Sequence, residues 1–372
     1  MTETLRVTYE LRAEHDEDPR TKARDIAYEQ TVELSPALVP GEVDERIPGR
    51  IEQLEPLPGD RLWQAVIAFP AAAIGTELTQ ALNVLFGNIS LKRGIRIVDV
   101  EWPTSLLDAV GGPRLGIEGL RAMAGSPARP LVATAVKPMG LGAAELADIC
   151  ARFARGGIDI IKDDHGLANQ PSAPYYERVA RSQEAVTGAA AASGTRSVYF
   201  PNVSAPWPHM MERSEYARAQ GCPGVLVNPM ITGLDAIHSI ADETGLAVLA
   251  HPSLTGSYFL PDHGIVPEVL LGDIFRMAGA DAVIYPNVGG RFGFSGALCG
   301  RINDHLRRPF AGLRAAMPAP GGGMAVDQAG HWAARYGRDT ILLIGGSLYA
   351  QGDLETGSRR LRAAVETFDE RE

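Results

Sequence analysis

The chain has 372 residues, which is more than one average domain and fewer than three. Hydrophobic residues make up 45% and charged residues 22%, values typical of a folded chain, so widespread disorder is excluded. The formal charge is -10 and no basic run occurs, so we expect no nucleic-acid partner, and no stretch reaches the ~20 apolar residues of a membrane helix.

The residues before about position 115 predict a small α+β (ferredoxin-like) domain. Residues 1–20 are polar and acidic, without the apolar core of a signal peptide. A Gly-Gly-Pro cluster at 111–113 is typical of a linker, so we place this domain at residues 1–115. Alternating apolar residues predict strands, and helical spacing predicts one helix at 74–84; the strands are expected at 4–12, 28–34, 62–70 and 95–103.

From about residue 130 a strand–helix pattern repeats eight times, which predicts a C-terminal TIM (β/α)8 barrel over residues 116–372. The strand segments are near-continuous apolar runs, as parallel strands buried on both faces are. A doubly wound open sheet is the alternative, but its glycine fingerprint is missing at the first turn. The expected strands are 131–137, 158–164, 197–202, 224–228, 247–251, 282–287, 315–320 and 341–346, and the expected helices are 142–157, 174–192, 210–220, 233–243, 266–278, 297–314, 327–337 and 353–369.

The cysteines Cys150, Cys222 and Cys299 are odd in number, far apart and without metal-ligand spacing. A disulfide framework or a zinc site is therefore not expected, and a reducing compartment is. Together with the polar first residues, this pattern predicts a cytoplasmic protein.

Polar residues recur where the predicted barrel strands end, which is where barrel enzymes hold their active sites. The sharpest cluster is Lys162-Asp163-Asp164-His165. Side chains alternate along a strand, so Lys162 and Asp164 share one face, and His165 can turn back toward it. A lysine, a carboxylate and an imidazole together indicate a metal site or acid–base chemistry, whereas an ordinary solvated strand end is the alternative.

Other strand ends carry candidate groups of less specific kind. Lys137 precedes a proline and is a candidate proton-transfer residue, although a lysine that merely extends into solvent fits as well. His251 closes another strand and is a candidate catalytic group or an ordinary rim histidine. Glycine pairs follow strands seven and eight, where barrels bind phosphate; these are Gly322, Gly323, Gly345 and Gly346. Arg291 lies in a glycine-rich loop expected to act as a lid whose arginine binds an anionic group of the substrate, and an ordinary exposed loop is the alternative.

These motifs resemble the large subunit of ribulose bisphosphate carboxylase, and more closely its non-carboxylating relatives, the RuBisCO-like (form IV) proteins. GGIDIIKDDHGLANQ at 156–170 is similar to the family's Gly-Gly-x-Asp-x-x-Lys-Asp-Asp-Glu motif. AVKPMGLG at 135–142 is similar to its Lys-Pro stretch, and EQTVE (29–33) and FGNISL (86–91) are typical of the relatives' N-terminal domain.

The resemblance implies roles for individual residues. Lys162 would take up CO2 as a carbamate and hold Mg2+ together with Asp164 and the residue at position 165. Lys137 would handle a substrate proton and His251 would bind substrate. Asn88 would reach the site of a neighbouring subunit, which implies a homodimer or a higher assembly of dimers. The phosphate-binding turns would be formed by Gly322, Gly323, Gly345 and Gly346.

Several departures from the family pattern argue against CO2 fixation. His165 replaces the ligating glutamate, which favours altered coordination, Mn2+ in place of Mg2+, or no metal. A second lysine of the first loop is replaced around Met139, and Arg291 is the cation nearest to the missing loop-six lysine. Pro252, Tyr285 and Gly321 stand where the family has an arginine, a histidine and a serine, respectively.

The sequence therefore predicts a lyase or isomerase that forms a metal-stabilised enolate or enediolate from a phosphorylated keto-sugar or keto-sugar-acid. Relatives of this kind act as isomerase, enolase, decarboxylase or hydrolase, and His165 favours the sugar-acid branch. One alternative is a methylthioribulose-phosphate enolase or isomerase of methionine salvage. Another is a non-catalytic binding or regulatory barrel that has lost its metal.

Overall fold

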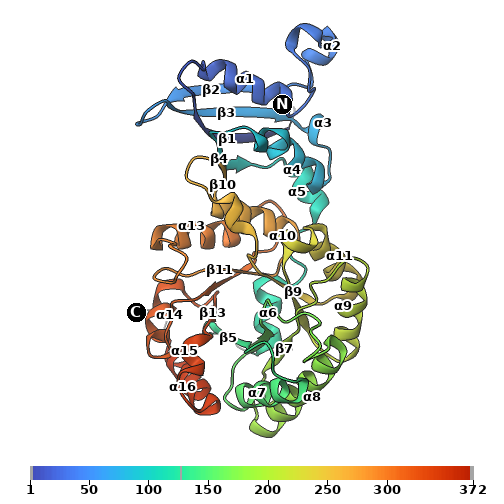
Figure 1. Ribbon diagram of the computed structural model, residues 1–372, viewed down its shortest axis with the longest axis vertical. Coiled ribbons are helices and arrows are strands. Elements are labelled where there is room, and N and C mark those ends of the chain that lie inside the picture. The colour runs from blue at the N-terminus through green and yellow to red at the C-terminus, as the bar shows by residue number, and fades with distance from the viewer. Residues whose placement is uncertain (1–2, 126–127, 369–372) are drawn as a thin grey trace. The chain divides into compact units, whose positions relative to one another are not determined.

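The computed structural model describes residues 3–125 and 128–368, and the chain forms two compact units. The first unit comprises Met1–Gly112, Leu254–Met277 and Pro309–Leu313, and the second comprises Pro113–Ser253, Ala278–Arg308 and Arg314–Glu372. Each unit has its own sheet (Figure 1). The single division at residue 115 stays a prediction.

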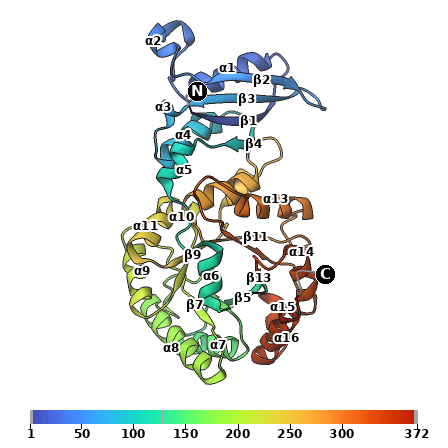
Figure 2. The same ribbon diagram turned by 180° about the vertical axis from the view of Figure 1, so that it is seen from behind.

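The sheet of the first unit has five strands in the order β10-β4-β1-β3-β2. Along β1 every second residue is buried, as its alternating sequence predicts. Helix α1 lies along one face of this sheet in both views (Figures 1 and 2). The strands are β1 (Thr4–Arg12), β2 (Arg50–Pro56), β3 (Leu62–Pro70), β4 (Ile95–Glu101) and the short β10 (Gly264–Ile265), which pairs parallel to β4.

The strand expected at 28–34 is wrong, because these residues hold the end of helix α1 (Pro19–Glu29) and the turn after it. The Asp18 carboxylate accepts hydrogen bonds from two backbone N–H groups of the first turn, and Pro19 occupies a first-turn position. These start signals outweigh a short alternating pattern. The helix expected at 74–84 is in fact two helices, α3 (Ala71–Ile74) and α4 (Leu78–Phe86), interrupted at Gly75 with φ of +63°.

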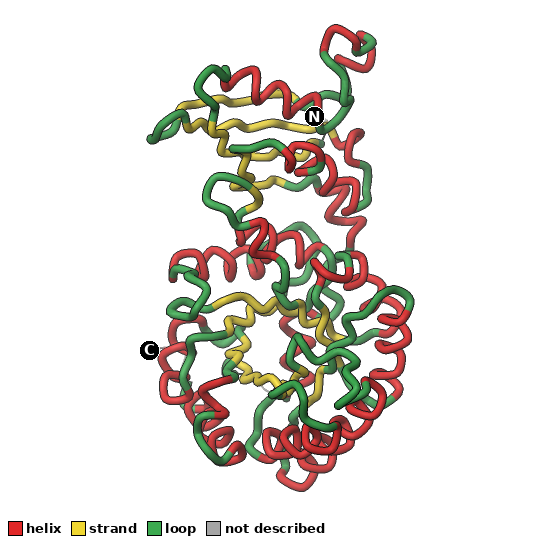
Figure 3. The backbone as a smooth tube through the Cα atoms, in the orientation of Figure 1, coloured by secondary structure: helices red, strands yellow, loops and turns green. Residues whose placement is uncertain are grey.

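The second unit contains the predicted barrel, a parallel sheet of eight strands in the order β7-β6-β5-β13-β12-β11-β9-β8. A parallel bridge between Asn202 and Leu226 joins the two ends of this order, and the strands form a ring inside the helices (Figure 3). The strands are β5 (Leu131–Val136), β6 (Ile160–Asp163), β7 (Val198–Phe200), β8 (Gly224–Val227), β9 (Ala247–Ala250), β11 (Ala282–Pro286), β12 (Met317–Gly321) and β13 (Ile341–Leu343).

The long helices lie where the sequence predicts them, with two exceptions. The helix expected at 297–314 ends at Arg307. The helix expected at 266–278 is a π-helical segment, Glu268–Ile274, followed by α12 (Phe275–Met277), and it belongs to the first unit. None of the helices in the described ranges is long and apolar enough to span a bilayer. The barrel helices are α6 (Gly116–Ala124), α7 (Ala143–Arg155), α8 (Tyr175–Ser193), α9 (His209–Ala219), α11 (Asp235–Thr244), α13 (Gly296–Arg307), α14 (Ala329–Tyr336) and α16 (Leu354–Glu366); shorter ones are α2 (Gly41–Asp44), α5 (Thr104–Val110), α10 (Pro229–Thr232), α15 (Gly346–Tyr349) and the 3-10 turns Pro36–Leu38, Asn88–Leu91, Thr255–Tyr258 and Val326–Gln328.

One buried cluster fills the barrel interior and identifies the inward-facing positions of every strand. Because side chains alternate, positions two and four residues further along a strand also face inward. Helix α6 contributes to the same cluster and covers the amino-terminal end of the ring. The inward residues include Leu131 and Ala133 of β5, Ile160 of β6, Phe200 of β7, Leu226 of β8, Ala247 and Leu249 of β9, Ala282 and Ile284 of β11, Met317 and Ala319 of β12, and Ile341 of β13.

A buried carboxylate at the start of β11 ties the barrel together at its amino-terminal end. Asp281 Oδ1 accepts hydrogen bonds from the N–H groups of Leu115 and Gly116, both at 2.7 Å, and Oδ2 accepts one from Val248 at 2.9 Å. Three buried donors on two separate segments thus depend on one side chain.

Replacing Asp281 by alanine is expected to lower the free energy of unfolding by about 3 kcal/mol, because three buried N–H groups lose their acceptor. Urea unfolding followed by circular dichroism measures this change. The matched control is Asp242→Ala on α11, whose carboxylate is exposed and pairs with His238. That control is expected to stay within about 0.5 kcal/mol of the original protein. Equal effects of the two substitutions would contradict the role given to Asp281.

Candidate active site

The alternation along three barrel strands brings the predicted catalytic residues to one end of the barrel. Lys162 and Asp164 follow inward-facing Ile160 by two and four residues, Lys137 follows Ala133 by four, and His251 follows Leu249 by two. All lie at or just beyond the carboxyl ends of β6, β5 and β9. This is the end at which barrel enzymes place their chemistry.

Lys162 is buried, with 2% of its surface exposed, and its Nζ donates a hydrogen bond to the backbone oxygen of Asp163 at 3.0 Å. Burial lowers the pKa of Lys162 to about 8, with a further contribution from the charge of Lys137, while the nearby Asp164 carboxylate opposes the shift. The neutral amine form of Lys162 is therefore more populated near neutral pH than in an ordinary lysine, and a neutral amine is nucleophilic.

Asp164 forms the ionic centre of the site. Lys137 Nζ lies 2.8 Å from Asp164 Oδ1, and His165 Nδ1 lies 3.6 Å from the same oxygen. Burial alone would raise the pKa of Asp164, but hydrogen bonds from His165 and Lys137 and the charge of Lys162 hold it well below its usual range. Asp164 is therefore a carboxylate at any physiological pH, surrounded by three basic groups.

Asp163, between these residues in sequence, points away from the site into the helix layer. Its carboxylate accepts hydrogen bonds from Arg178 Nε at 3.2 Å and Nη2 at 3.1 Å, from the Tyr199 hydroxyl at 2.6 Å, and from the Asn202 N–H at 3.0 Å. Arg178 is fully buried on α8. This ion pair fixes the strand end and so sets the direction of Lys162 and Asp164.

A tight turn brings His165 back over the barrel mouth. The N–H of Leu167 donates to the backbone oxygen of Asp164 at 2.9 Å, and the side-chain amide of Asn202 donates to the oxygens of His165 and Leu167 at 3.0 and 2.9 Å. The His165 ring stacks on that of His251, with centroids 4.3 Å apart and an angle of 9°. The two imidazoles thus form one wall of the site.

The hydrogen bonds of His251 determine which ring nitrogen carries its proton. Nδ1 accepts from the N–H of Ser253 at 3.2 Å and lies 2.8 Å from the Ser253 hydroxyl. Burial lowers the pKa of His251 to about 2, and the charges of Lys162 and His165 add to the shift. The ring is therefore neutral, and because Nδ1 accepts, the proton resides on Nε2.

The glycine turns after β12 and β13 lie next to each other, since these strands are neighbours. The N–H of Val326, beyond the first turn, donates to the Ser347 hydroxyl just after the second at 3.1 Å. A side chain at Gly322, Gly345 or Gly346 would meet nothing within 4 Å, so the backbone there is open. Gly323 differs, because a Cβ would lie 2.6 Å from the backbone nitrogen of Gly290, and its role is close packing.

Two predicted substrate-binding residues are not brought to this cluster. Arg291 is exposed, and its guanidinium carbon lies 5.3 Å from the centre of the Phe292 ring. Asn88 belongs to the first unit, where its side-chain nitrogen donates to the carboxylates of Glu29 and Glu33. The buried Gln30 holds this arrangement, donating to the backbone oxygens of Asn83 and Val84. Contact of Arg291 and Asn88 with substrate stays a prediction.

The structure also locates two of the positions at which the chain departs from the carboxylase pattern. The Tyr285 hydroxyl donates to Asn303 on α13, so this side chain faces the helix layer and not the barrel mouth. Met139, at the position of a missing lysine, has its Cε 3.1 Å from the Cβ site of Gly166, beside the turn of His165. An apolar thioether therefore occupies a place next to the ionic centre.

Three residues outside the predicted site support or extend it. Ser253 sets the His251 tautomer, and the Tyr349 hydroxyl accepts the Lys137 N–H at 2.7 Å. Asn228 lies at an inward position two residues beyond Leu226, and its buried Oδ1 has no hydrogen-bond partner in the described ranges. Asn228 is the last residue of the strand expected at 224–228 and so belongs to the polar residues that recur at strand ends, whereas no sequence signal marks Ser253 or Tyr349.

A divalent cation fits these residues only under one condition. Among the described residues, no group of three His, Cys, Asp or Glu side chains is placed to hold a metal. Asp164 and His165 offer one carboxylate and one imidazole, and hard cations such as Mg2+ need further oxygen ligands. A carbamate on Lys162 would supply them, and the neutral amine of Lys162 is the form that reacts with CO2.

Comparison with known proteins agrees with the resemblance to the ribulose bisphosphate carboxylase family. Residues 116–296 match the family model for the ribulose bisphosphate carboxylase large chain, catalytic domain. The chain is 41% identical to ribulose bisphosphate carboxylase-like protein 1 of Rhodopseudomonas palustris, covering 95% of each chain. It is 38% identical to 5-methylthioribulose-1-phosphate isomerase of Rhodospirillum rubrum, covering 95% of this chain and 93% of that protein.

A solved structure agrees with both sequence matches. The crystal structure of the Rubisco-like protein from Rhodopseudomonas palustris superimposes with a TM-score of 0.90 at 37% identity, covering 100% of both chains. Similarity therefore extends over both units and includes the segment with the Lys162 motif. The chain belongs to the RuBisCO-like proteins of the ribulose bisphosphate carboxylase large-chain family.

Proposed function

We propose that this protein is an isomerase or enolase that moves a proton next to the carbonyl group of a phosphorylated ketose, through an enediolate. The observation that carries the proposal is the inward placement of Lys137, Lys162, Asp164 and His251 at one end of the barrel. A carbon acid next to a carbonyl needs a group that moves the proton and donors that stabilise the oxygen anion, and this cluster offers both.

His251 and Lys137 have complementary parts in this chemistry. The Nε2–H of the neutral His251 ring donates to the substrate carbonyl oxygen and stabilises the negative charge that develops there. Lys137 carries the transferred proton at Nζ, and Asp164, 2.8 Å away, orients this amine. Because Lys137 is partly exposed, its amine exchanges protons with water between turnovers.

The resemblance to the carboxylase family supports a metal cofactor at the same place. Lys162 as a carbamate, Asp164 and His165 would hold the cation, and His165 leaves Mn2+ as an alternative to Mg2+. When bound, such an ion supplies electrostatic stabilisation of the enediolate oxygens. The open backbone at Gly322, Gly345 and Gly346 would receive the phosphate group, as glycine turns at this end of barrels commonly do.

The comparisons favour one substrate class. The relative named 5-methylthioribulose-1-phosphate isomerase is 38% identical over nearly the whole chain, which supports a methylthio-pentose phosphate ahead of a keto-sugar-acid. Exposed apolar side chains follow the carboxyl ends of β5, β7 and β11, namely Met139 at 55% exposure, Trp207 at 56% and Phe292 at 63%. An apolar methylthio group would find suitable contacts among them. A homodimer and a cytoplasmic location stay predictions.

The proposal is tested by incubating the purified protein in D2O with Mg2+ or Mn2+ and bicarbonate, followed by 1H and 31P nuclear magnetic resonance. We expect 5-methylthioribulose 1-phosphate to exchange its proton next to the carbonyl and to form an isomer. Ribulose 1,5-bisphosphate with labelled bicarbonate is expected to give no acid-stable product, since two carboxylase lysines, those of the first loop near Met139 and of loop six near Arg291, are absent. Carboxylation would overturn the assignment, and no turnover of any ketose phosphate would favour the non-catalytic alternative.

Lys137→Met is expected to reduce the rate of proton exchange by about 10²- to 10⁴-fold, the usual contribution of a general acid–base group. Lys92→Met is the matched control, because Lys92 is a surface lysine paired with Asp25 in the first unit. The control is expected to retain the original rate. An unchanged rate in Lys137→Met would assign the proton transfer to another group.

Lys162→Met tests the carbamate separately from turnover. In the original protein, 13C-labelled bicarbonate is expected to give a carbamate resonance, and Mg2+ with bicarbonate should raise the melting temperature. A ligand at 100 times its Kd stabilises the folded state by about 2.7 kcal/mol. Both signals should disappear in Lys162→Met and persist in Lys92→Met. Retention of the metal-dependent shift in Lys162→Met would show that the cation binds elsewhere.

A further inference from the structure

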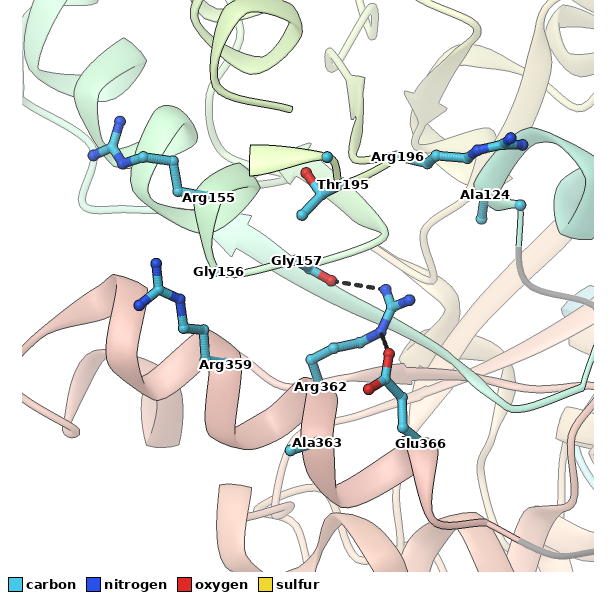
Figure 4. Close-up of a pocket in the computed structure, with 12 residues that line it drawn as sticks. Ala124, Arg155, Gly156, Gly157, Thr195, Arg196, Arg359, Arg362, Ala363 and Glu366 are labelled. Carbon is cyan, nitrogen blue, oxygen red and sulfur yellow. Dashed lines mark hydrogen bonds and ion pairs between the residues drawn. The ribbon is translucent and has the colours of Figure 1, made fainter. Parts of the chain in front are cut away.

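A pocket lies at the end of the barrel opposite to the proposed active site. Its volume is about 490 Å³, and arginines and glycines make up most of its lining residues (Figure 4). Pockets of a few hundred Å³ accommodate small metabolites. The arginines are Arg155 of α7, Arg196 ahead of β7, and Arg359 and Arg362 of α16.

The pocket is separate from the proposed active site. Gly156 and Gly157 line it and come just before β6, while Gly194 and Thr195 come just before β7, so it lies at the amino ends of the strands. Lys162 is five residues beyond Gly157 along an extended segment, which corresponds to about 17 Å. The pocket therefore does not share lining residues with the catalytic cluster.

Glycines at the floor of the pocket allow α16 and Arg196 to approach closely. A Cβ on Gly156 would lie 2.2 Å from Ser358 Cβ and 2.8 Å from the backbone oxygen of Glu355. A Cβ on Gly125 would lie 2.4 Å from Arg196 Cδ. Any larger residue at these two positions would displace α16 or Arg196, so the glycines allow the arginines to surround one cavity.

The pocket carries an excess of positive charge in an acidic protein. The four lining arginines and Arg129, which shares Asp159 with Arg362, carry five positive charges, and their carboxylate partners Asp159, Glu355 and Glu366 carry three negative ones. Two positive charges therefore remain, whereas the whole chain has a formal charge of -10. Such a local excess attracts an anion against the field of the rest of the protein.

The individual arginines differ in how firmly they are held. Arg362 Nη1 donates to the backbone oxygen of Gly157 at 3.0 Å and to Asp159 at 2.7 Å, and its Nε donates to Glu366 at 2.7 Å. Arg155 and Arg359 share the Glu355 carboxylate, and Figure 4 shows Arg359 beside Arg362 on α16 with Arg155 on the neighbouring helix α7. Arg196 has no acidic partner in the described ranges, and Figure 4 shows its side chain extending toward Ala124.

We propose that this pocket binds a phosphate-bearing small molecule as a second, non-catalytic ligand. Guanidinium groups match phosphate oxygens with paired hydrogen bonds, and two uncompensated positive charges match a phosphate dianion. The volume admits a small metabolite, and the acidic remainder of the chain disfavours a nucleic acid. Binding joins α16, α7 and the segment before β7 through one anion.

Isothermal titration calorimetry of the full chain with inorganic phosphate at low ionic strength tests this site. Arg196→Gln/Arg359→Gln is the test variant, because both side chains are exposed and their removal leaves the fold intact. Arg181→Gln is the matched control, an exposed arginine of α8 paired with Glu177 outside the pocket. We expect phosphate affinity at this site to fall at least tenfold in the test variant and to stay unchanged in the control.

Crystals soaked in tungstate separate this site from the proposed phosphate site of the catalytic end. An anomalous peak within hydrogen-bonding distance of Arg196 or Arg359, absent in the double variant, is the expected result. Equal phosphate affinity in original and double-variant protein, or tungstate only beside Gly322 and Gly345, would overturn the proposal. Binding of heparin or duplex DNA without binding of phosphate would overturn it as well.

Discussion

The alternation of side chains along the strands of a closed parallel ring is the constraint on which the active site depends. Residues that face the barrel interior form the packed apolar cluster. The next inward-facing positions, at the carboxyl ends of the strands, are Lys137, Lys162, Asp164 and His251. A shift of one residue in β6 would send Lys162 to the helix layer and bring Asp163 inward. Packing of the apolar interior therefore also orients the side chains of the proposed active site.

The charged pair on the other face of β6 protects this register. Asp163 and Arg178 are both buried, and a buried ion pair is strongly destabilised when one partner is lost or displaced. A shift of β6 by one residue would turn Asp163 inward and leave the Arg178 guanidinium without its carboxylate. Two adjacent acidic residues thus have different roles. Asp163 fixes the strand, and Asp164 faces the barrel mouth.

The barrel and the Lys162 cluster could be predicted from the sequence because both depend on local patterns. Apolar runs of strand length recur between helical segments, and Lys162 and Asp164 share a face whatever the neighbouring strands are. The strand expected at 28–34 failed because the helix start at Asp18 and Pro19 competes with a short alternation. The roles of Ser253 and Tyr349 could not be predicted from local patterns. Ser253 acts through the geometry of one loop, in which its N–H donates to His251. Tyr349 contacts Lys137, which is distant in sequence.

The two ends of the barrel use the same residue types under different electrostatic conditions. At the carboxyl end, lysines and imidazoles are crowded around one carboxylate, and burial lowers the pKa of Lys162 and of His251, which favours their neutral forms. At the amino end, arginines keep their charge in any surroundings and are balanced by Asp159, Glu355 and Glu366. Groups that can change protonation state thus occur at the strand ends where we propose that the reaction takes place. Groups that cannot change it occur at the end where an anion would be held without reacting.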